Sequence, residues 1–359
     1  MRRWSIRVAR RKWHAITFAP GSFINTQQTV FLTDAERAAA RPHFSAARGR
    51  REALNNLTVE EEVEKAEAGE EFAVASAKEL ALRELFRTMD SALVAFSGGV
   101  DSTYVACVAN EELGRRALCI TGVSPSLASN GREEVAALVE RLGLRHEIVN
   151  TEEMDDPSYT RNEGDRCYFC KSELYSKLAP LAEERGIAFV VDGSTTDDLG
   201  DYRPGRAAAG ERGVRSPLVE VGMSKREVRL MSRRAGLPTW DKPASPCLSS
   251  RLAYGTPVTI ERLSAVDRGE ALMRAMGFRE FRVRHHGEIV RLEIAPAELD
   301  KALRREVVDE MARRFRELGF RYVTLDLHGY RTGAMNEILN SIQRSAVSAQ
   351  LSENTEAKS

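Results

Sequence analysis

The chain has 359 residues, of which 42% are hydrophobic and 30% are charged, an ordinary composition for a globular protein of one to three domains. Lys+Arg and Asp+Glu each number 53, and this neutral balance argues against a protein that coats nucleic acid. No uninterrupted apolar run reaches the roughly 18 residues of a transmembrane helix, and five cysteines are too few for a disulfide scaffold. We therefore expect a cytoplasmic protein with no membrane partner.

Charge is concentrated at the amino-terminal end. Residues 1–51 carry 11 Lys or Arg and two acidic residues, whereas residues 52–72 carry eight Glu and one Lys. We expect residues 1–72 to be a flexible charged extension that becomes helical after Leu57, because glutamate favours helix. An over-extended start is one alternative, and an organelle transit peptide is another, because such peptides are rich in arginine and poor in acids. The segment has no apolar core followed by a cleavage site of small residues, so we do not expect a secretory signal peptide.

Apolar runs alternate with helical patterns through the middle of the chain. Strands are predicted at 92–96, 117–123, 146–150 and 187–191. Helices are predicted between them at 101–113, around 135–142 and at 173–185, and a Ser224/Glu227 capping box begins another that stops at Gly236. This alternation predicts an α/β domain over 73–246, an open parallel sheet with helices on both faces. Ligands of such sheets bind beyond the carboxyl ends of the strands.

The remainder predicts a smaller C-terminal α+β domain over 247–336, followed by a polar tail at 337–359. Its expected elements are a helix, two strands of a hairpin, a second helix and a last strand, at 261–276, 281–284, 290–294, 307–318 and 322–326. We expect this domain to supply substrate contacts.

The first chemical motif is Ser97-Gly98-Gly99-Val100-Asp101-Ser102, between a predicted strand and a predicted helix. The glycines allow close backbone approach, and a helix amino terminus favours an anion. The hydroxyls of Ser97 and Ser102 can donate to phosphate, and Asp101 can orient the loop or help hold Mg²⁺. No Gly-Lys-Ser/Thr follows, so this is not a Walker A loop, and the alternative is an ordinary glycine turn. The motif resembles the PP-loop of the N-type ATP pyrophosphatases, which implies cleavage of ATP to AMP and pyrophosphate with adenylation of a substrate.

Two further strand ends fit an ATP site. Thr121 lies near the end of the second strand, where the resemblance would place adenine or ribose. Gly193 follows the fourth strand in D-G-S-T-T-D-D and permits close backbone approach, and Asp197 or Asp198 could assist Mg²⁺. The same segment is also typical of a helix cap and turn, so both interpretations stay open.

The cysteines divide into two groups. Cys107 and Cys119 fall on apolar faces and are expected to be buried small hydrophobes. Cys167 and Cys170 form a C-x-x-C beside basic residues, and Cys247 follows two prolines at the expected domain junction. Zinc would need a fourth ligand, such as His285 or His286, and a thioredoxin-like pair should open a helix. Structural thiols are a third interpretation. We favour a fourth, a three-cysteine [4Fe–4S] site with one iron free of protein ligands.

These motifs in order resemble the LarE family of ATP-dependent sulfur transferases, which mature the nickel-pincer cofactor of lactate racemase. The resemblance covers residues 73–336 and leaves out the extension. Its matching segments are S-G-G-V-D-S at 97–102, D-R-C-Y-F-C-K at 165–171, D-G-S-T-T-D-D-L-G-D-Y-R-P-G at 192–205, R-S-P-L at 215–218, L-P-T-W-D-K-P-A-S-P-C-L-S-S-R-L-A-Y-G-T-P-V-T at 237–259, R-V-R-H-H-G at 282–287 and G-Y-R-T-G at 329–333.

The resemblance implies a reaction and its participants. ATP adenylates a carboxylate of a pyridinium dicarboxylate mononucleotide, and sulfur then displaces AMP to give a thiocarboxylate. In one version of the family the cysteine matching Cys247 gives up its own sulfur and becomes dehydroalanine. In the other, three cysteines hold a [4Fe–4S] cluster that carries sulfide. Because Cys167, Cys170 and Cys247 are all present, we predict the cluster version, with ATP, Mg²⁺, sulfide or a sulfur donor, and a homo-oligomer.

Further site residues follow from the same resemblance. Lys171 would face the site and pair with AMP or pyrophosphate oxygens; the alternative is a solvated lysine at a helix start. Arg282 and Arg284 alternate on a predicted strand, so both lie on one face and suit a mononucleotide phosphate, although a charged strand face would look the same. Glu293, on the next strand, is a weaker candidate for positioning or proton transfer.

Other functions remain open at this point. A transfer-RNA-thiolating enzyme also combines a PP-loop with three cysteines, but residues 73–359 are close to neutral and give no basic surface, although the basic amino-terminal arm weakens that objection. An amide-forming PP-loop ligase that uses ammonia would need no cysteines. A nucleotide-binding sensor would bind ATP and release no pyrophosphate.

Overall fold

The computed structural model describes residues 69–199 and 204–331. The predicted tail at 337–359 and almost all of the predicted extension at 1–72 lie outside the described residues. The first described helix, α3 (Glu70–Thr88), begins inside the end of the predicted extension and buries Leu82 and Phe86 in the core. The structured part of the chain therefore starts before residue 72.

A four-stranded sheet forms the centre of the first region. Its strands are β1 (Ala92–Ala95), β2 (Ala117–Val123), β3 (His146–Asn150) and β4 (Phe189–Val191). Their order is β3-β2-β1-β4, and every pairing is parallel. The predicted open parallel sheet is confirmed. The chain runs outward from β1 to β3 and then returns to the other side of β1, so the topological switch point lies between β1 and β4.

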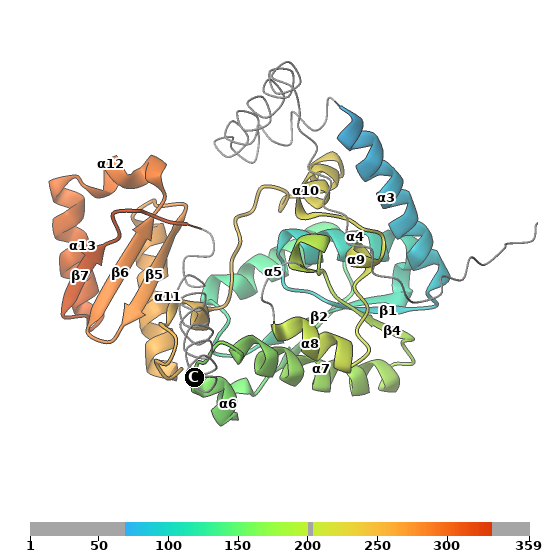
Figure 1. Ribbon diagram of the computed structural model, residues 1–359, viewed down its shortest axis with the longest axis horizontal. Helices are drawn as coiled ribbons and strands as arrows, with labels where there is room; N and C mark the ends of the chain where they lie inside the picture. Colours follow the sequence, from blue (N-terminus) through green and yellow to red (C-terminus); the bar gives the residue numbers. More distant parts are fainter. Residues whose placement is uncertain (1–68, 200–203, 332–359) are drawn as a thin grey trace, which may run out of the picture. The chain divides into compact units, whose positions relative to one another are not determined.

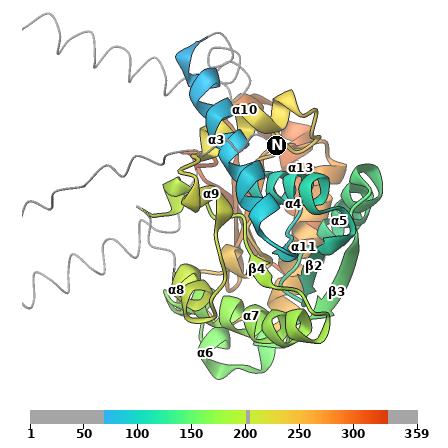
Figure 2. The same ribbon diagram turned by 90° about the vertical axis from the view of Figure 1, so that its right-hand side faces the viewer.

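Helices cover both faces of this sheet. Above it in Figure 1 lie α3, α4 (Val100–Leu113) and α10 (Lys225–Arg234), and below it lie α7 (Arg166–Glu184) and α8 (Pro204–Glu211). In Figure 2 α7 and α8 again lie side by side. The alternation of β1 serves both layers, because Val94 packs in the core of α3 and α4 whereas Leu93 packs in that of α7 and α8.

Local sequence explains where helices begin and end. The Ser224/Glu227 capping box is present at the start of α10, and Gly143 ends α5 (Ser129–Leu142) in a left-handed conformation with φ 60°. The predicted start of α7 at residue 173 was wrong, because α7 begins at Arg166. The C-x-x-C segment has no helical apolar period of its own, and this is why the pattern hid the first two turns. Cys167 and Cys170 therefore lie one turn apart on one face of a helix.

The second region combines a three-stranded sheet with helices. Strands β5 (Phe281–His286) and β6 (Ile289–Ile294) form an antiparallel hairpin, and β7 (Tyr322–Leu325) pairs parallel to β6. Helices α11 (Ile260–Ala275) and α13 (Arg305–Glu317) pack on this sheet around Met273 and Phe315. The short helices of the described chain are α6 (Pro157–Thr160), α9 (Pro217–Glu220) and α12 (Leu299–Ala302), with 3₁₀ turns at Gly114–Arg116, Glu153–Asp155, Thr196–Leu199, Leu248–Arg251 and Pro296–Glu298.

Within residues 69–199 and 204–331, no helix has both the length and the apolar character that crossing a membrane would require.

Candidate active site

The S-G-G-V-D-S motif forms a tight loop between β1 and α4. Gly98 has φ +69°, a conformation that favours glycine, and a Cβ there would lie 3.0 Å from Val135 Cγ2 of α5. The Ser97 amide donates to Ser102 Oγ at 3.2 Å, and the two serine hydroxyls lie 3.0 Å apart. The loop thus turns its serine hydroxyls toward each other at the amino terminus of α4, where the helix dipole favours an anion.

Gly193, at the end of β4, lies directly against this loop. A Cβ on Gly193 would lie 2.8 Å from Ser102 N and 3.0 Å from Asp101 C, so only glycine fits. The loops after β1 and β4 therefore meet at the switch point of the sheet, where α/β proteins bind ligands. The structure brings the predicted ATP-binding residues of both loops together.

Asp101 is held by a lysine that the sequence analysis missed. Lys225 Nζ bonds to one carboxylate oxygen of Asp101, and the Lys225 amide donates to Asp197 Oδ2 at 2.6 Å. The other oxygen, Asp101 Oδ1, is buried and has no hydrogen-bond partner among the described residues. Burial raises the pKa of Asp101, and the charge of Lys225 opposes that rise. The signal for Lys225 was present, because the capping box fixes it as the first residue of α10.

Thr121 has a structural role on β2. Its hydroxyl donates to Phe96 O at 2.7 Å and lies 2.8 Å from His146 Nε2. Thr121 is buried, and its hydrogen bonds join β2 to the residue that precedes the glycine loop. A contact to adenine or ribose stays a prediction.

Cys167 and Cys170 lie in the first two turns of α7, a helix that packs against α8. A Cβ on Gly205 of α8 would lie 3.2 Å from Cys167 O and 2.8 Å from Lys171 Cγ, so glycine allows the two helices to approach here. Cys170 packs against a hydrophobic cluster that includes Tyr159 and Leu248, the residue after Cys247. The two distant cysteine segments therefore share one cluster.

The three sulfurs also act on one another electrostatically. Burial raises the pKa of the Cys170 thiol, and Cys247 raises it further. Cys167 is open to solvent, yet desolvation by the surrounding protein atoms raises its pKa, Cys247 adds to the rise, and Arg166 opposes it. Charge effects of this kind require proximity. Arg166, beside Cys167, donates to Ser249 O at 2.9 Å, and Cys170 packs against the cluster that includes Leu248, so the C-x-x-C and Cys247 segments are neighbours. We call Cys167, Cys170 and Cys247 the thiol cluster.

Lys171 links the thiol cluster to the nucleotide loops. Its ammonium lies 5.6 Å from the centre of the Tyr175 ring. Tyr175, Cys170 and Asp192 raise the pKa of Lys171, and burial opposes them. Asp192 immediately precedes Gly193, and its carboxylate accepts from the Ser194 hydroxyl at 2.9 Å. Tyr175 in turn donates to the Asp192 carboxylate at 3.3 Å, so Tyr175 connects Lys171, the residue after Cys170, to the loop that lies against the glycine turn.

Cys247 is half-buried, just before the turn Leu248–Arg251. The Leu248 amide donates to Ser126 O at 2.8 Å, in the loop after β2. The Cys247 segment is thus attached to the carboxyl edge of the parallel sheet.

Arg282 and Arg284 are buried against the Cys247 segment. Arg282 lies 4.6 Å from the centre of the Tyr330 ring and donates to Ala244 O, and Arg284 donates to Ser250 O at 2.8 Å. Arg284 also pairs with Glu293 at 2.8 Å, and that carboxylate is 1% exposed. Arg282 and Arg284 thus both bond to the segment that carries Cys247, and Glu293 is joined to it through Arg284. A phosphate contact of the two arginines, and positioning or proton transfer by Glu293, stay predictions.

Glu153, after β3, is a second residue that the sequence analysis missed. It is 2% exposed, and its Oε1 accepts from Ser124 Oγ at 2.5 Å and from Ser126 Oγ at 2.9 Å. Its Oε2 is buried with no hydrogen-bond partner in the described part of the chain. After burial and Cys247, Glu153 is a further cause of the raised pKa of Cys170. No motif surrounds Glu153, so only the fold could reveal it.

The thiol cluster has the donor chemistry of an iron–sulfur site, because clusters of that kind are held by cysteine thiolates. Among the described residues, however, no group of three or more His, Cys, Asp or Glu side chains is arranged so that it could hold a metal ion. The three cysteines are therefore of the residue type that binds an iron–sulfur cluster, but their side chains are not arranged as a complete set of ligands.

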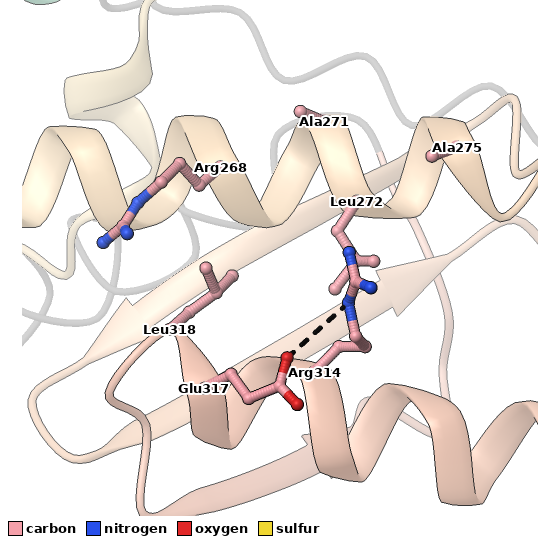
Figure 3. Close-up of a pocket in the computed structure, with 7 residues that line it drawn as sticks. All are labelled: Arg268, Ala271, Leu272, Ala275, Arg314, Glu317 and Leu318. Atoms are coloured by element: carbon pink, nitrogen blue, oxygen red, sulfur yellow. Dashed lines mark ion pairs between the residues drawn. The ribbon is translucent and has the colours of Figure 1, made fainter.

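A separate groove of about 400 Å³ lies between α11 and α13. Arg314 pairs with Glu317 across 3.9 Å at its edge (Figure 3). Its lining residues include none of the predicted site residues; they are Arg268, Ala271, Leu272, Ala275, Arg314, Glu317 and Leu318.

Comparison with known proteins gives several relatives, among them two that align with this chain over nearly their whole length. No family model matches the chain. An uncharacterized protein of Synechocystis is 49% identical over 258 residues, which span 72% of this chain and 96% of that protein. The pyridinium-3,5-bisthiocarboxylic acid mononucleotide synthase of Lactiplantibacillus plantarum is 36% identical over 272 residues, 76% of this chain and 98% of that enzyme. The glutamine-hydrolysing GMP synthase of Aeropyrum pernix is 31% identical over 208 residues, which cover 51% of this chain and 39% of that protein.

Proposed function

We infer the function from family membership: this chain belongs to the LarE family, the family of the pyridinium-3,5-bisthiocarboxylic acid mononucleotide synthase. We propose that it is an ATP-dependent sulfur transferase in nickel-pincer cofactor biosynthesis. Its substrate would be a pyridinium dicarboxylate mononucleotide, and its product the corresponding thiocarboxylate.

The first half-reaction would take place at the glycine loop. A carboxylate oxygen of the substrate attacks the α-phosphorus of ATP, and pyrophosphate leaves, so the carboxylate becomes an acyl adenylate. The amino terminus of α4 and the hydroxyls of Ser97 and Ser102 would hold phosphate oxygens. The buried, unpartnered Asp101 Oδ1 would bind Mg²⁺, which prefers carboxylate oxygen.

The second half-reaction would take place at the thiol cluster. Sulfide attacks the carbonyl carbon of the acyl adenylate, the bond to AMP breaks, and a thiocarboxylate remains. Cys167, Cys170 and Cys247 would hold a [4Fe–4S] cluster, which would supply an iron site for the incoming sulfide. Lys171 would balance the negative charge of the departing AMP or pyrophosphate.

One observation carries this proposal. The loop after β4 lies against the glycine loop at Gly193. Asp192, the residue before Gly193, accepts a hydrogen bond at 3.3 Å from Tyr175, whose ring lies 5.6 Å from the ammonium of Lys171, the residue after Cys170. Adenylation and sulfur delivery must act on the same carboxyl carbon, so a single connected site is what the chemistry requires.

Single variants Cys167→Ala, Cys170→Ala and Cys247→Ala test the proposal, with Cys107→Ala as the control because Cys107 is also half-buried but lies on α4. We expect each site variant to release pyrophosphate in the presence of ATP and the mononucleotide and to form no thiocarboxylate. Cys107→Ala should form product at the wild-type rate. Thiocarboxylate formation by all three site variants would refute sulfur delivery from this cluster.

The match to GMP synthase supports a second candidate, an amide-forming ligase that uses ammonia. Such an enzyme needs no thiols. The triple variant at Cys167, Cys170 and Cys247, supplied with an ammonium salt, would then convert the carboxylate to an amide as fast as the wild type does. Absence of amide in both proteins would remove this candidate.

A further inference from the structure

Five main-chain carbonyl oxygens in segment 244–250 accept hydrogen bonds from arginine side chains. The donors lie far apart in the sequence, on α7, in the turn Leu248–Arg251 and on β5. The contacts are Arg282 to Ala244, Arg251 to Pro246 at 2.5 Å and to Cys247 at 3.1 Å, Arg166 to Ser249 at 2.9 Å, and Arg284 to Ser250 at 2.8 Å.

These guanidinium groups are deeply buried, and their charges are only partly paired. Arg251 is 2% exposed and bonds to Glu270 at 2.7 Å, and Arg284 pairs with Glu293. Arg166 is 4% exposed and bonds to the neutral amide oxygen of Asn162 in addition to Ser249 O. Burying a charge is expensive unless strong hydrogen bonds compensate it, so the carbonyls of this segment form part of the compensation.

The segment makes only part of its hydrogen bonds with its own main chain. Pro243 and Pro246 lack amide hydrogens and disfavour a regular helix. In the turn that follows, the Ser250 amide donates to Cys247 O at 3.0 Å and the Leu252 amide donates to Ser249 O at 3.1 Å, so the arginines add to these bonds. A guanidinium offers five N–H groups in a rigid plane and can therefore hold more than one carbonyl at once. Arg251 does so, since it reaches Pro246 O, Cys247 O and Ser250 Oγ.

We propose that Arg166, Arg251, Arg282 and Arg284, here called the arginine cradle, are positioning residues that fix the backbone on both sides of Cys247 and so hold its sulfur in place beside the C-x-x-C segment. That the arginines hold the backbone rests on the hydrogen bonds alone. That this holding serves sulfur transfer rests on the proposed function. The cradle gives Arg282 and Arg284 a task that is separate from binding a substrate phosphate.

Arg251→Gln tests the cradle in the full-length, reduced, iron-free protein. We expect the amide of Leu248, which bonds to Ser126 O, to exchange its hydrogen about tenfold faster or more, because hydrogen bonds to charged groups are the stronger class. Alkylation of Cys247 by iodoacetamide, read from peptide masses, should accelerate to a similar extent. Arg262→Gln is the matched control: Arg262 also donates to a carbonyl, Pro257 O at 2.6 Å, but from an exposed position outside the segment.

A second variant guards against simple misfolding. Arg251→Gln leaves the buried Glu270 with only its longer ion pair, to Arg274 at 3.7 Å, so Arg251→Gln combined with Glu270→Gln removes both charges of the buried pair. The melting temperature of this double variant should lie closer to that of the wild type than the melting temperature of Arg251→Gln does. The Leu248 amide should still exchange its hydrogen fast in the double variant. Arg251→Lys should restore only part of the protection, since an ammonium lacks the planar set of donors. Wild-type exchange and alkylation at this segment in both Gln variants would overturn the cradle, whatever the activity assays show.

Loss of thiocarboxylate formation with pyrophosphate release intact, alongside faster exchange, would support the positioning role. A different outcome is that the variant exchanges faster but the wild-type protein forms no acyl adenylate. That result would support the arginine cradle and refute the proposed function.

Discussion

Two parts of the candidate site are held in place in opposite ways. One is the place where the loops after β1 and β4 meet, here called the nucleotide edge, and the other is the Cys247 segment, residues 244–250. At the nucleotide edge, regular elements place the main chain: β1 and β4 end beside each other, and Gly193 lies against the start of α4. At the Cys247 segment, an irregular main chain is held by four buried arginines, the adjacent Arg251 and three that lie far away in the sequence, Arg166, Arg282 and Arg284. The difference implies that one half of the site depends on small residues and the other on buried charge.

The environment of the thiols gives the largest expected effect. Burial raises the pKa of Cys170 well above the ordinary 9.0, so its thiol keeps its proton at neutral pH. In iron-free protein at pH 7 we expect iodoacetamide to alkylate Cys170 more than about 100-fold more slowly than in the urea-unfolded chain, since each pKa unit is tenfold in thiolate.

The raised pKa of Cys170 also makes the free energy of unfolding depend on pH. The unfolded thiol loses its proton at lower pH than the folded one, so its contribution to the free energy of unfolding falls as pH rises above 9. Peptide mass spectrometry at several pH values measures the alkylation. Equal rates for the folded and unfolded chains would show that Cys170 is not buried.

Gly193→Ala tests the close main-chain approach at the nucleotide edge. The added methyl would meet Ser102 N, so we expect a loss of about 1–3 kcal/mol in the free energy of unfolding and slower pyrophosphate release. Gly210→Ala in α8 is the control, because no atom lies within 4 Å of a Cβ there and alanine favours helix by about 1 kcal/mol. Urea unfolding of both variants decides: similar stability for the two would mean that the loops after β1 and β4 do not touch.

Lys225→Met should have a smaller, pH-dependent effect. It removes the cation beside the buried Asp101, whose pKa would rise further, and we expect a loss of about 1–2 kcal/mol at neutral pH. A raised carboxyl pKa makes the folded state retain its proton longer than the unfolded state. The variant should therefore lose stability as pH rises from the ordinary pKa of 3.8 toward the raised value.

Lys177→Met is the control for this trend, because Lys177 pairs with the exposed carboxylate of Glu152. It should change stability by less than about 1 kcal/mol, with little dependence on pH. Parallel pH profiles for the two variants would contradict the special position of Asp101.

Arg313→Ala should have the smallest effect on stability of the variants considered. Arg313 pairs with Glu310 and Glu317 on the exposed face of α13, far from any buried charge. We expect a change of no more than about 0.5 kcal/mol in thermal unfolding, because exposed ion pairs contribute little. A loss as large as that of Arg251→Gln would show that burial does not separate the two kinds of arginine contact.

The two halves of the site also differ in how far the sequence predicts them. The four parallel strands and the glycine loop follow from apolar runs and from a motif whose residues are adjacent in the chain. The contacts of Gly193, Lys225 and Glu153 depend on which strands become neighbours, and that is not written in any local pattern. The arginine contacts at segment 244–250 lie still further from prediction, because an arginine on a strand looks the same whether it binds a phosphate or a carbonyl.

The start of α7 is a smaller lesson of the same kind. The Cys167–Cys170 segment lacks an apolar period because its side chains face α8 and the thiol cluster rather than one continuous core. Tyr168 packs in one hydrophobic cluster and Phe169 and Cys170 in another, so the first turns of α7 show no single apolar period.

One isotope experiment tests the central claim, that the transferred sulfur comes from external sulfide and that the three thiols survive the reaction. The protein, reconstituted without oxygen, receives ATP, Mg²⁺, the pyridinium mononucleotide and sulfide labelled with heavy sulfur, and mass spectrometry then weighs product and protein. The account predicts a thiocarboxylate that contains the heavy isotope and a polypeptide of unchanged mass. Unlabelled sulfur in the product, together with a chain lighter by one hydrogen sulfide at Cys247, would contradict it.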